Sequence, residues 1–321
     1  MTSSSETSSR ELAGERVLVV GGRGFVGSHI VRALIAAGAR PQLFGPPMAE
    51  DRLADIAGAF DERDGSIESR DSLRDALLAT QARSIVCCAA HGVGRLGLMK
   101  SGEADADAAM DINVIGLHKL LDSARTASVR RVVWTSSTVV YGPSASYPSQ
   151  PVDEQAPMAP TTVYGLTKSL AEDVAAFYSR RHGMSVVGLR LPLILGPGLW
   201  YAGAASGLMQ IYEAAKAGTP YSLCSHDEMI DLMHASDVGL AVLRALQHGG
   251  ALSHIYNLEG FKARASDLVA AVKLQDPGAR IGLELAAPLT LFPLVSGARF
   301  HDDTGFKAVH GLPAFTKAML A

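Results

Sequence analysis

The stretch that decides the fold reads VLVVGGRGFVG over residues 17–27. Its apolar beginning predicts a buried strand over residues 16–20, and the amphipathic stretch 28–37 behind it predicts a helix. Glycines spaced G-x-x-G-x-x-G permit a tight turn and let backbone N–H groups approach a pyrophosphate, whose charge the helix N-terminus favours. Glycines alone would indicate only a turn, but this context favours a dinucleotide site. The residues expected to form it are Gly21, Gly24, Phe25, Val26 and Gly27.

Strand-like and helix-like segments alternate outward from this turn. The segments are 84–89 and 108–124, 131–134 and 162–181, and 186–191. This alternation predicts an α/β fold with a doubly wound parallel sheet, that is, a Rossmann fold. It weakens after Pro192, where glycines and prolines accumulate.

The same pattern predicts the domain organisation. We expect a dinucleotide-binding domain over residues 15–191, with 235–258 returning to it. Residues 192–234 and 259–321 are expected to form a smaller substrate-binding lobe. The polar residues 1–14 are expected to be a disordered lead-in, because they hold no apolar segment of the kind that a secretory signal has.

Composition bounds the function. The chain has 321 residues, of which 48% are hydrophobic and 19% charged, and a formal net charge of −3. These values exclude a globally disordered chain and an overall basic nucleic-acid binder. No apolar stretch reaches the roughly 20 residues of a bilayer-spanning helix. We therefore expect a small-molecule substrate, with neither nucleic acid nor membrane as a partner.

Cysteines and possible metal ligands give weaker signals. The three cysteines form no CxxC pair, so a disulfide framework or cysteine-rich zinc site is not expected, and a reducing, cytoplasmic location fits best. Cys87 and Cys88 lie in an apolar run and are interpreted as buried strand residues. The stretch 226–234 is dense in His, Asp and Glu but lacks HExxH spacing, so no metal site is predicted.

The second strand bears on the choice between NAD and NADP. An acidic residue about 20 positions after the glycine turn normally binds the adenosine ribose of NAD, but Gly45 stands at this place. Arg23 or Arg52 would then face a 2′-phosphate, which tilts the prediction slightly toward NADP. The alternative is that each arginine is a solvated surface charge.

A tyrosine and a lysine carry the predicted chemistry. Tyr164 and Lys168 are four residues apart near the start of a predicted helix, so they share one face. A nearby cation and a positive nicotinamide favour the phenolate, which lets Tyr164 exchange a proton with a substrate hydroxyl or carbonyl. Lys168 would also hold the nicotinamide ribose. An exposed i,i+4 pair is the alternative, which the glycine turn upstream disfavours.

The strand 131–134 runs into the hydroxyl residues TSST at 135–138. Carboxyl ends of parallel strands face the ligand crevice, so one of these hydroxyls would bond the reacting oxygen. His91 follows another such strand, and it either lines the crevice or caps a loop.

These motifs together resemble the extended short-chain dehydrogenase/reductase superfamily, specifically the NAD-dependent epimerase/dehydratase family. The resemblance covers nearly the whole chain. Beyond the glycine turn and Tyr164/Lys168, the segments that carry it are Ala89-Ala90, NVIG at 113–116, Leu189-Arg190, GPG at 196–198, and DLMH at 231–234 before Asp237-Val238.

The resemblance implies further site residues. By alignment on Tyr141-Gly142, Ser137 matches the catalytic serine of the family, with Thr138 as the alternative. Ser66 and Ile67 would lie near adenine, and Pro192 near the nicotinamide. The other positions expected at the cofactor are Ala89, Ala90 and Asn113, and those expected at the substrate are His91, Ser137, Thr138 and Leu193.

Departures from the family pattern narrow the range of possible substrates. Thr138-Val139 follow Ser137 where dehydratases of the family carry two acids, which disfavours 4,6-dehydration. Leu193 and Ile230 stand where nucleotide-sugar enzymes often have an Asn and an Arg that serve a diphosphate. Without that Asn and that Arg, the protein lacks much of the expected binding free energy for the charged diphosphate. The departures favour a smaller substrate, and 190–192 with 204–207 weakly resemble sugar-acid dehydrogenases.

Three functional hypotheses follow. The first is an NAD(P)-dependent oxidoreductase that interconverts a secondary alcohol and a ketone on a small, sugar-like or sugar-acid substrate. The second is a nucleotide-sugar 4-epimerase. The third is a non-catalytic dinucleotide-sensing protein, which would not need Ser137, Tyr164 and Lys168 together. A homodimer is also expected. The helical apolar residues Leu117, Leu120 and Leu121 are interpreted as core, with a dimer face as the alternative.

Overall fold

A seven-stranded sheet forms the centre of the computed structural model, which describes residues 10–203, 205–287 and 291–321. The strand order is β10-β6-β5-β4-β1-β2-β3, and each neighbouring pair is parallel. The strands are β1 (Arg16–Val20), β2 (Arg40–Gly45), β3 (Asp61–Asp64), β4 (Ser84–Cys87), β5 (Arg131–Ser137), β6 (Ser185–Leu191) and β10 (Ile255–Asn257). The predicted doubly wound Rossmann sheet is confirmed.

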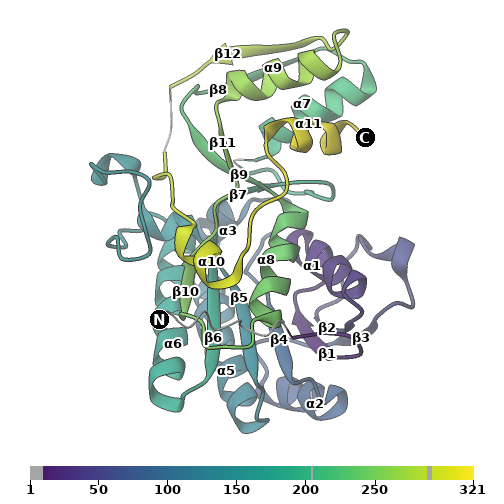
Figure 1. The fold of residues 1–321 in the computed structure, drawn as a ribbon, viewed down its shortest axis with the longest axis vertical. Helices are drawn as coiled ribbons and strands as arrows, with labels where there is room; N and C mark the ends of the chain where they lie inside the picture. Colours follow the sequence, from purple (N-terminus) through teal and green to yellow (C-terminus); the bar gives the residue numbers. More distant parts are fainter. Residues whose placement is uncertain (1–9, 204, 288–290) are drawn as a thin grey trace, which may run out of the picture.

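Alternation along the strands builds two apolar layers. Val17 and Val19 of β1 face one layer, with α1 (Phe25–Ala36) and α8 (Ala235–Gln247). Leu18 and Val20 face the other, because successive side chains of a strand point to opposite faces. That layer holds α2 (Arg70–Thr80), α5 (Leu117–Thr126) and α6 (Val163–His182) (Figure 1).

The predicted helix 108–124 is helical throughout, but its middle is a π-helix. It divides into α4 (Ala106–Met110), a π-helix (Asp111–Gly116) and α5, with α3 (Leu98–Ala104) just before them. A π-helical turn adds a residue to a helix and is frequent at functional sites. Here it contains Asn113, one of the expected cofactor residues.

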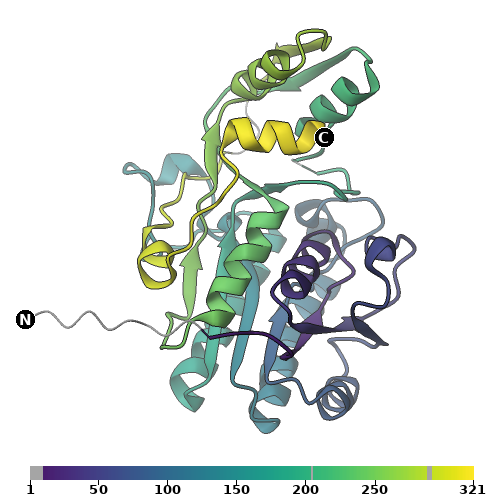
Figure 2. The same ribbon diagram turned by 45° about the vertical axis from the view of Figure 1, so that its right-hand side comes forward.

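A smaller lobe lies above the carboxyl ends of the strands (Figure 2). It contains a three-stranded sheet of order β11-β9-β7 and a parallel pair of β12 with β8. Its strands are β7 (Leu193–Leu195), β8 (Tyr221–Ser225), β9 (Ile230–His234), β11 (Phe261–Ala263) and β12 (Ile281–Leu285). Its helices include α7 (Ser206–Ala217), α9 (Ala265–Gln275) and α11 (Leu312–Leu320), whereas α10 (Ala298–Thr304) lies beside β10 (Figure 1).

The chain leaves the central sheet after β6, returns as α8 and β10, and leaves again. This path follows the expected division at residues 192, 235 and 259, although the exact domain boundaries stay a prediction. Residues 1–9 of the expected lead-in lie outside the described residues, and Leu12 at its end is buried against the core of α1. In the described chain, no helix is both long and apolar enough to cross a membrane.

Candidate active site at the carboxyl ends of the strands

The glycine turn between β1 and α1 has no room for side chains. A Cβ at Gly27 would lie 2.2 Å from the carbonyl oxygen of Gly21, and one at Gly21, whose φ is +83°, would lie 2.8 Å from the backbone nitrogen of Ala89. The first turn of α1 carries no acidic residue. Its backbone N–H groups and positive helix end therefore suit a pyrophosphate, as a dinucleotide site requires.

Arg23 extends from this turn to the end of β2. Its Nη1 donates hydrogen bonds to the carbonyl oxygens of Gly45 (3.0 Å) and Pro46 (3.2 Å). Its Nη2 lies 3.0 Å from a carboxylate oxygen of Glu62 and 3.1 Å from one of Asp64. The guanidinium thus stands beside Gly45, where the sequence pattern predicts the ribose.

Arg52, the other candidate for a 2′-phosphate, is occupied elsewhere. Its Nε donates to the carbonyl oxygen of Gly198 at 3.1 Å, and its guanidinium lies over the Trp200 ring at 5.2 Å. Ser66 and Ile67 follow β3 at the same end of the sheet. The Ser66 hydroxyl bonds Glu68, whereas Ile67 is buried against the helices.

The end of β4 is tied to the catalytic helix through Asn113. Its Oδ1 accepts from the His91 backbone at 2.8 Å, and its Nδ2 donates to Thr167 Oγ1 at 2.9 Å. Thr167 in turn donates to the carbonyl oxygen of Tyr164 at 2.8 Å. Asn113 thus fixes β4 relative to α6, and Ala89 contacts the glycine turn. The imidazole of His91 is buried, and its Nε2 has no hydrogen-bond partner among the described residues.

The three predicted catalytic residues come together. Ser137 ends β5 and is the N-cap of a short 3-10 helix (Thr138–Tyr141), and its hydroxyl lies beside the Tyr164 phenol. Thr162 caps the N-terminus of α6, which starts the helix so that Tyr164 and Lys168 share one face. Lys168 Nζ donates to the Thr135 carbonyl oxygen at 2.8 Å and lies 5.7 Å from the centroid of the Tyr164 ring.

Burial dominates the electrostatics of this group. It raises the pKa of Tyr164 well above the usual value, and the nearby Tyr201 acts in the same direction while the bond to Ser137 opposes both. Burial also lowers the pKa of Lys168 to about 8. A phenolate at neutral pH therefore needs additional positive charge, of the kind that an oxidised nicotinamide carries.

Tyr201, in the loop between β7 and α7, lies close to the catalytic residues and was not among the predicted site residues. The Tyr201 ring lies 6.4 Å from that of Phe25 in the cofactor turn, and Tyr201 is close enough to affect the pKa of Tyr164. The loop is joined to residues 91–97 by two hydrogen bonds, Ala202 N to Arg95 O (2.7 Å) and Gly97 N to Ala202 O (3.0 Å). The aromatic pair Trp200-Tyr201, two residues after GPG, was the available signal.

The positions that depart from the family pattern lie at the lobe. Pro192 separates β6 from β7, and Leu193 of β7 pairs with Leu232 of β9. Leu193 and Ile230 are partly buried hydrophobic residues packed against the core of the lobe. Neither offers a donor or a cation to a diphosphate.

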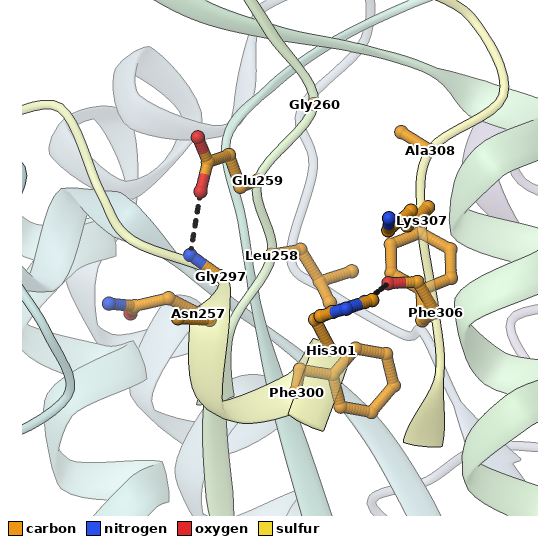
Figure 3. A pocket seen from close by; sticks show the side chains of 11 residues that line it. Asn257, Leu258, Glu259, Gly260, Gly297, Phe300, His301, Phe306, Lys307 and Ala308 are labelled. Carbon is orange, nitrogen blue, oxygen red and sulfur yellow. Dashed lines mark hydrogen bonds between the residues drawn. The ribbon is translucent and has the colours of Figure 1, made fainter. Parts of the chain in front are cut away.

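Other candidate sites lie apart from this group. A cavity of about 330 Å³ opens between α10 and the end of β10, and none of its lining residues is a predicted site residue (Figure 3). Two of its polar groups are already bonded, Glu259 to Gly297 N at 2.9 Å and His301 to Phe306 O at 3.0 Å. Within residues 10–203, 205–287 and 291–321, no three His, Cys, Asp or Glu residues gather as a metal site. Asp227 of the stretch 226–234 instead accepts from Ser266 N.

Comparisons with known proteins agree with this geometry. The family model described as "NAD dependent epimerase/dehydratase family" matches residues 17–258. UDP-glucose 4-epimerase of Rhizobium leguminosarum bv. trifolii is 29% identical over 253 residues, 74% of each chain. Sterol demethylase protein B of Methylococcus capsulatus is 31% identical over 188 residues, 56% of this chain and 52% of that protein.

Solved structures share the fold. UDP-glucose 4-epimerase of Thermus thermophilus, in complex with NAD, has a TM-score of 0.79 at 22% identity and covers 95% of this chain and 98% of its own. The GalE-like L-threonine dehydrogenase of Cupriavidus necator has a TM-score of 0.78 at 24% identity and covers 95% and 99%. The match of the family model over most of the chain shows that this protein belongs to the NAD-dependent epimerase/dehydratase family, as an NAD-dependent oxidoreductase of the extended short-chain type.

Proposed function

We propose that the protein is a dehydrogenase or reductase that interconverts a secondary alcohol and a ketone on a small, sugar-like or sugar-acid substrate. The observation that carries this proposal is the convergence of Ser137 and Lys168 on the buried phenol of Tyr164. Leu193 and Ile230 support the small substrate, because apolar side chains at the lobe give a nucleotide diphosphate no charged partner.

Each residue has a distinct role in the proposed mechanism. The bound nicotinamide supplies or accepts the hydride. Tyr164 Oη gives its proton to the ketone oxygen in reduction and takes the hydroxyl proton in oxidation. Ser137 orients that oxygen by a hydrogen bond, and the ammonium of Lys168 favours the phenolate.

We propose NADP as the slightly favoured coenzyme, with Arg23 as its discriminating residue. Support comes from its place beside Gly45, where no carboxylate of β2 repels a 2′-phosphate. Glu62 and Asp64 already pair with Arg23, so a phosphate would have to share the guanidinium with them. Fluorescence titration with NADH and NADPH measures this preference. Arg23→Ala is expected to weaken NADPH binding more than NADH binding, and equal losses would contradict the assignment.

The alternative is a nucleotide-sugar 4-epimerase, which the relatives named UDP-glucose 4-epimerase favour. An epimerase retains its cofactor between oxidation and re-reduction, whereas a dehydrogenase exchanges it. Tightly bound NAD that survives purification would therefore favour the epimerase, and exchangeable coenzyme would favour the dehydrogenase. A dinucleotide sensor would show binding without any turnover.

Tyr164→Phe tests the catalytic assignment in a screen of sugars and sugar acids that follows nicotinamide absorbance. Loss of the phenolic proton is expected to lower the rate about 10²- to 10⁴-fold while cofactor binding persists. Tyr178→Phe is the matched control, since Tyr178 lies on the same helix and its hydroxyl contacts His118. Full activity in Tyr164→Phe would refute the mechanism.

We also propose a homodimer that forms through α6 and the neighbouring π-helix. Leu117, Leu120 and Leu121 are core residues, so they form no dimer face. Exposed apolar side chains occur instead at Leu166 (41%) and Phe177 (52%), which are eleven residues apart on one face of α6, and at Ile115 (42%) beside it. A second copy would cover them.

A further inference from the structure

A buried ion pair lies directly behind the catalytic group. Glu172 of α6 and Arg190 of β6 are only 5% and 3% exposed, and two hydrogen bonds join them, Nε to Oε1 at 2.9 Å and Nη2 to Oε2 at 2.7 Å. A buried pair of this kind contributes little stability compared with a well-packed apolar pair. Its hydrogen bonds to residues that flank Ser137 in the chain suggest another role.

The pair forms hydrogen bonds with residues before and after Ser137 in the chain. Glu172 Oε1 accepts a hydrogen bond of 2.6 Å from Ser136 Oγ, one residue before Ser137. Arg190 donates to the hydroxyl of Tyr141, which ends the 3-10 helix that begins directly after Ser137. The Tyr141 hydroxyl also bonds Asn257 Oδ1 at 2.7 Å. The ion pair thus fixes the catalytic turn from both ends.

Glu172 is also one helical turn beyond Lys168 on the same face of α6. The groups around the Lys168 ammonium on other elements are the Thr135 carbonyl oxygen, the Trp134 ring, and the Cys87 and Cys88 thiols. On α6 itself they are the Tyr164 ring and Glu172.

Glu172 supplies the carboxylate of this shell, and Arg190 is its ion-pair partner. Burial raises the pKa of Cys87 to about 11 and that of Cys88 further, so both thiols are uncharged there. Burial lowers the pKa of Lys168 to about 8; Cys87 and Cys88 oppose this effect first and Glu172 after them, but the two thiols act only when they are ionised. Within the described part of the chain, Glu172 is therefore the anion that favours the ammonium form of Lys168.

We propose that Glu172, held by Arg190 and Ser136, is a positioning residue of the catalytic centre: it fixes the turn at Ser137 and keeps Lys168 charged. Its importance for turnover rests on the proposed function. The charge effect itself is a property of the cofactor-free protein, so it can be tested without substrate or coenzyme.

The test is a pH titration of the Lys168 side chain by NMR, in protein labelled with ¹³C at lysine Cε and without cofactor. The signal that is missing in Lys168→Met assigns the resonance. In Glu172→Gln, which keeps a hydrogen-bond acceptor for Ser136 but removes the charge, the midpoint is expected to fall by about one pH unit, a tenfold change in proton affinity. Asp173→Asn removes an exposed carboxylate from the same helix and is expected to leave the midpoint unchanged.

A second variant covers the case in which Glu172→Gln does not fold with Arg190 unpaired. Glu172→Gln/Arg190→Met removes both buried charges, and its midpoint is expected to fall as well. Glu172→Asp keeps the negative charge and is expected to recover most of the wild-type midpoint. If Glu172→Gln or Glu172→Gln/Arg190→Met folds and its Lys168 midpoint is unchanged, the inference is overturned. Failure of the proposed function is a different result, namely wild-type protein that catalyses no hydride transfer.

Discussion

At the scale of single residues, Lys168 carries its charge at a cost to the fold. The side chain is 3% exposed, and burial lowers its pKa to about 8 from an unperturbed value of 10.5. The unfolded chain therefore binds more protons than the folded protein between these two pH values, and stability rises with pH across that window. Below pH 8 the full cost is present, roughly 3 kcal/mol at 1.36 kcal/mol per pKa unit.

Lys168→Met is accordingly expected to stabilise the cofactor-free protein at pH 7, with a gain that shrinks as pH approaches 10.5. Urea unfolding of wild type and variant at pH 7 and pH 10 measures the difference. Lys273→Met, at an exposed position of α9, should show no such pH-dependent gain. A variant that is less stable than wild type at pH 7 would contradict the expectation.

At the scale of elements, we expect the junction of β9 and α8 to be sensitive to acid. His234 is the N-cap of α8, where its Nδ1 accepts from Ser236 N at 3.2 Å. Burial first, and then the neighbouring His310 and His29, lower the pKa of His234 to about 4, although Asp237 opposes them. An unfolded histidine titrates near 6.5, so stability is lost as the pH falls from 6.5 toward 4.

His234→Asn removes the titrating group but keeps a good helix N-cap. Its melting temperature is expected to fall less between pH 6.5 and 4.5 than that of the wild type, as thermal unfolding followed by circular dichroism would measure. His182→Asn replaces an exposed histidine at the end of α6 and serves as the control. Equal acid sensitivity of wild type and His234→Asn would show that the junction is not responsible.

The bounds of the strands are predicted better from the sequence than the bounds and type of the helix before β5. β1 and β6 match their predicted segments within one residue, because an unbroken apolar run pairs along its whole length. β5 runs three residues further than predicted, since Thr135–Ser137 continue to pair with β6 despite their hydroxyls. That extension places Ser137 at the strand end. The π-helix was not predicted, because its extra residue leaves the apolar pattern of 108–124 nearly intact.

The candidate site also contains both residues that the sequence predicts and residues that it does not. Helical spacing places Tyr164 beside Lys168, and parallel strands bring Ser137 to the same edge, so local rules predict the catalytic group. Tyr201 and the ion pair of Glu172 escaped prediction, because their positions depend on contacts between segments distant in the chain. The lobe strands β7 and β11 have three residues each, too few for a periodic pattern.

At the scale of the whole molecule, the proposed dimer has a direct test. Phe177→Glu places a charge in the exposed apolar face of α6 and is expected to shift the protein toward monomer, because an unpaired charge is costly to bury. Light scattering after size-exclusion chromatography measures the mass. Leu274→Glu changes a more exposed apolar residue of the lobe, at 84%, and should leave the mass unchanged. A wild-type protein that is monomeric at high concentration would exclude the dimer.

The order of the strands has a consequence for how the cell makes this chain. β6 leaves the ribosome long before its edge neighbour β10, because β7, α7, β8, β9 and α8 are translated between them. Until residue 257 emerges, one edge of β6 has no partner within the sheet, and an unpaired strand edge is a template for pairing with another chain. At about 5–20 residues per second this interval lasts several seconds. During this interval, pairing of the exposed β6 edge with another chain competes with folding, until β10 covers that edge.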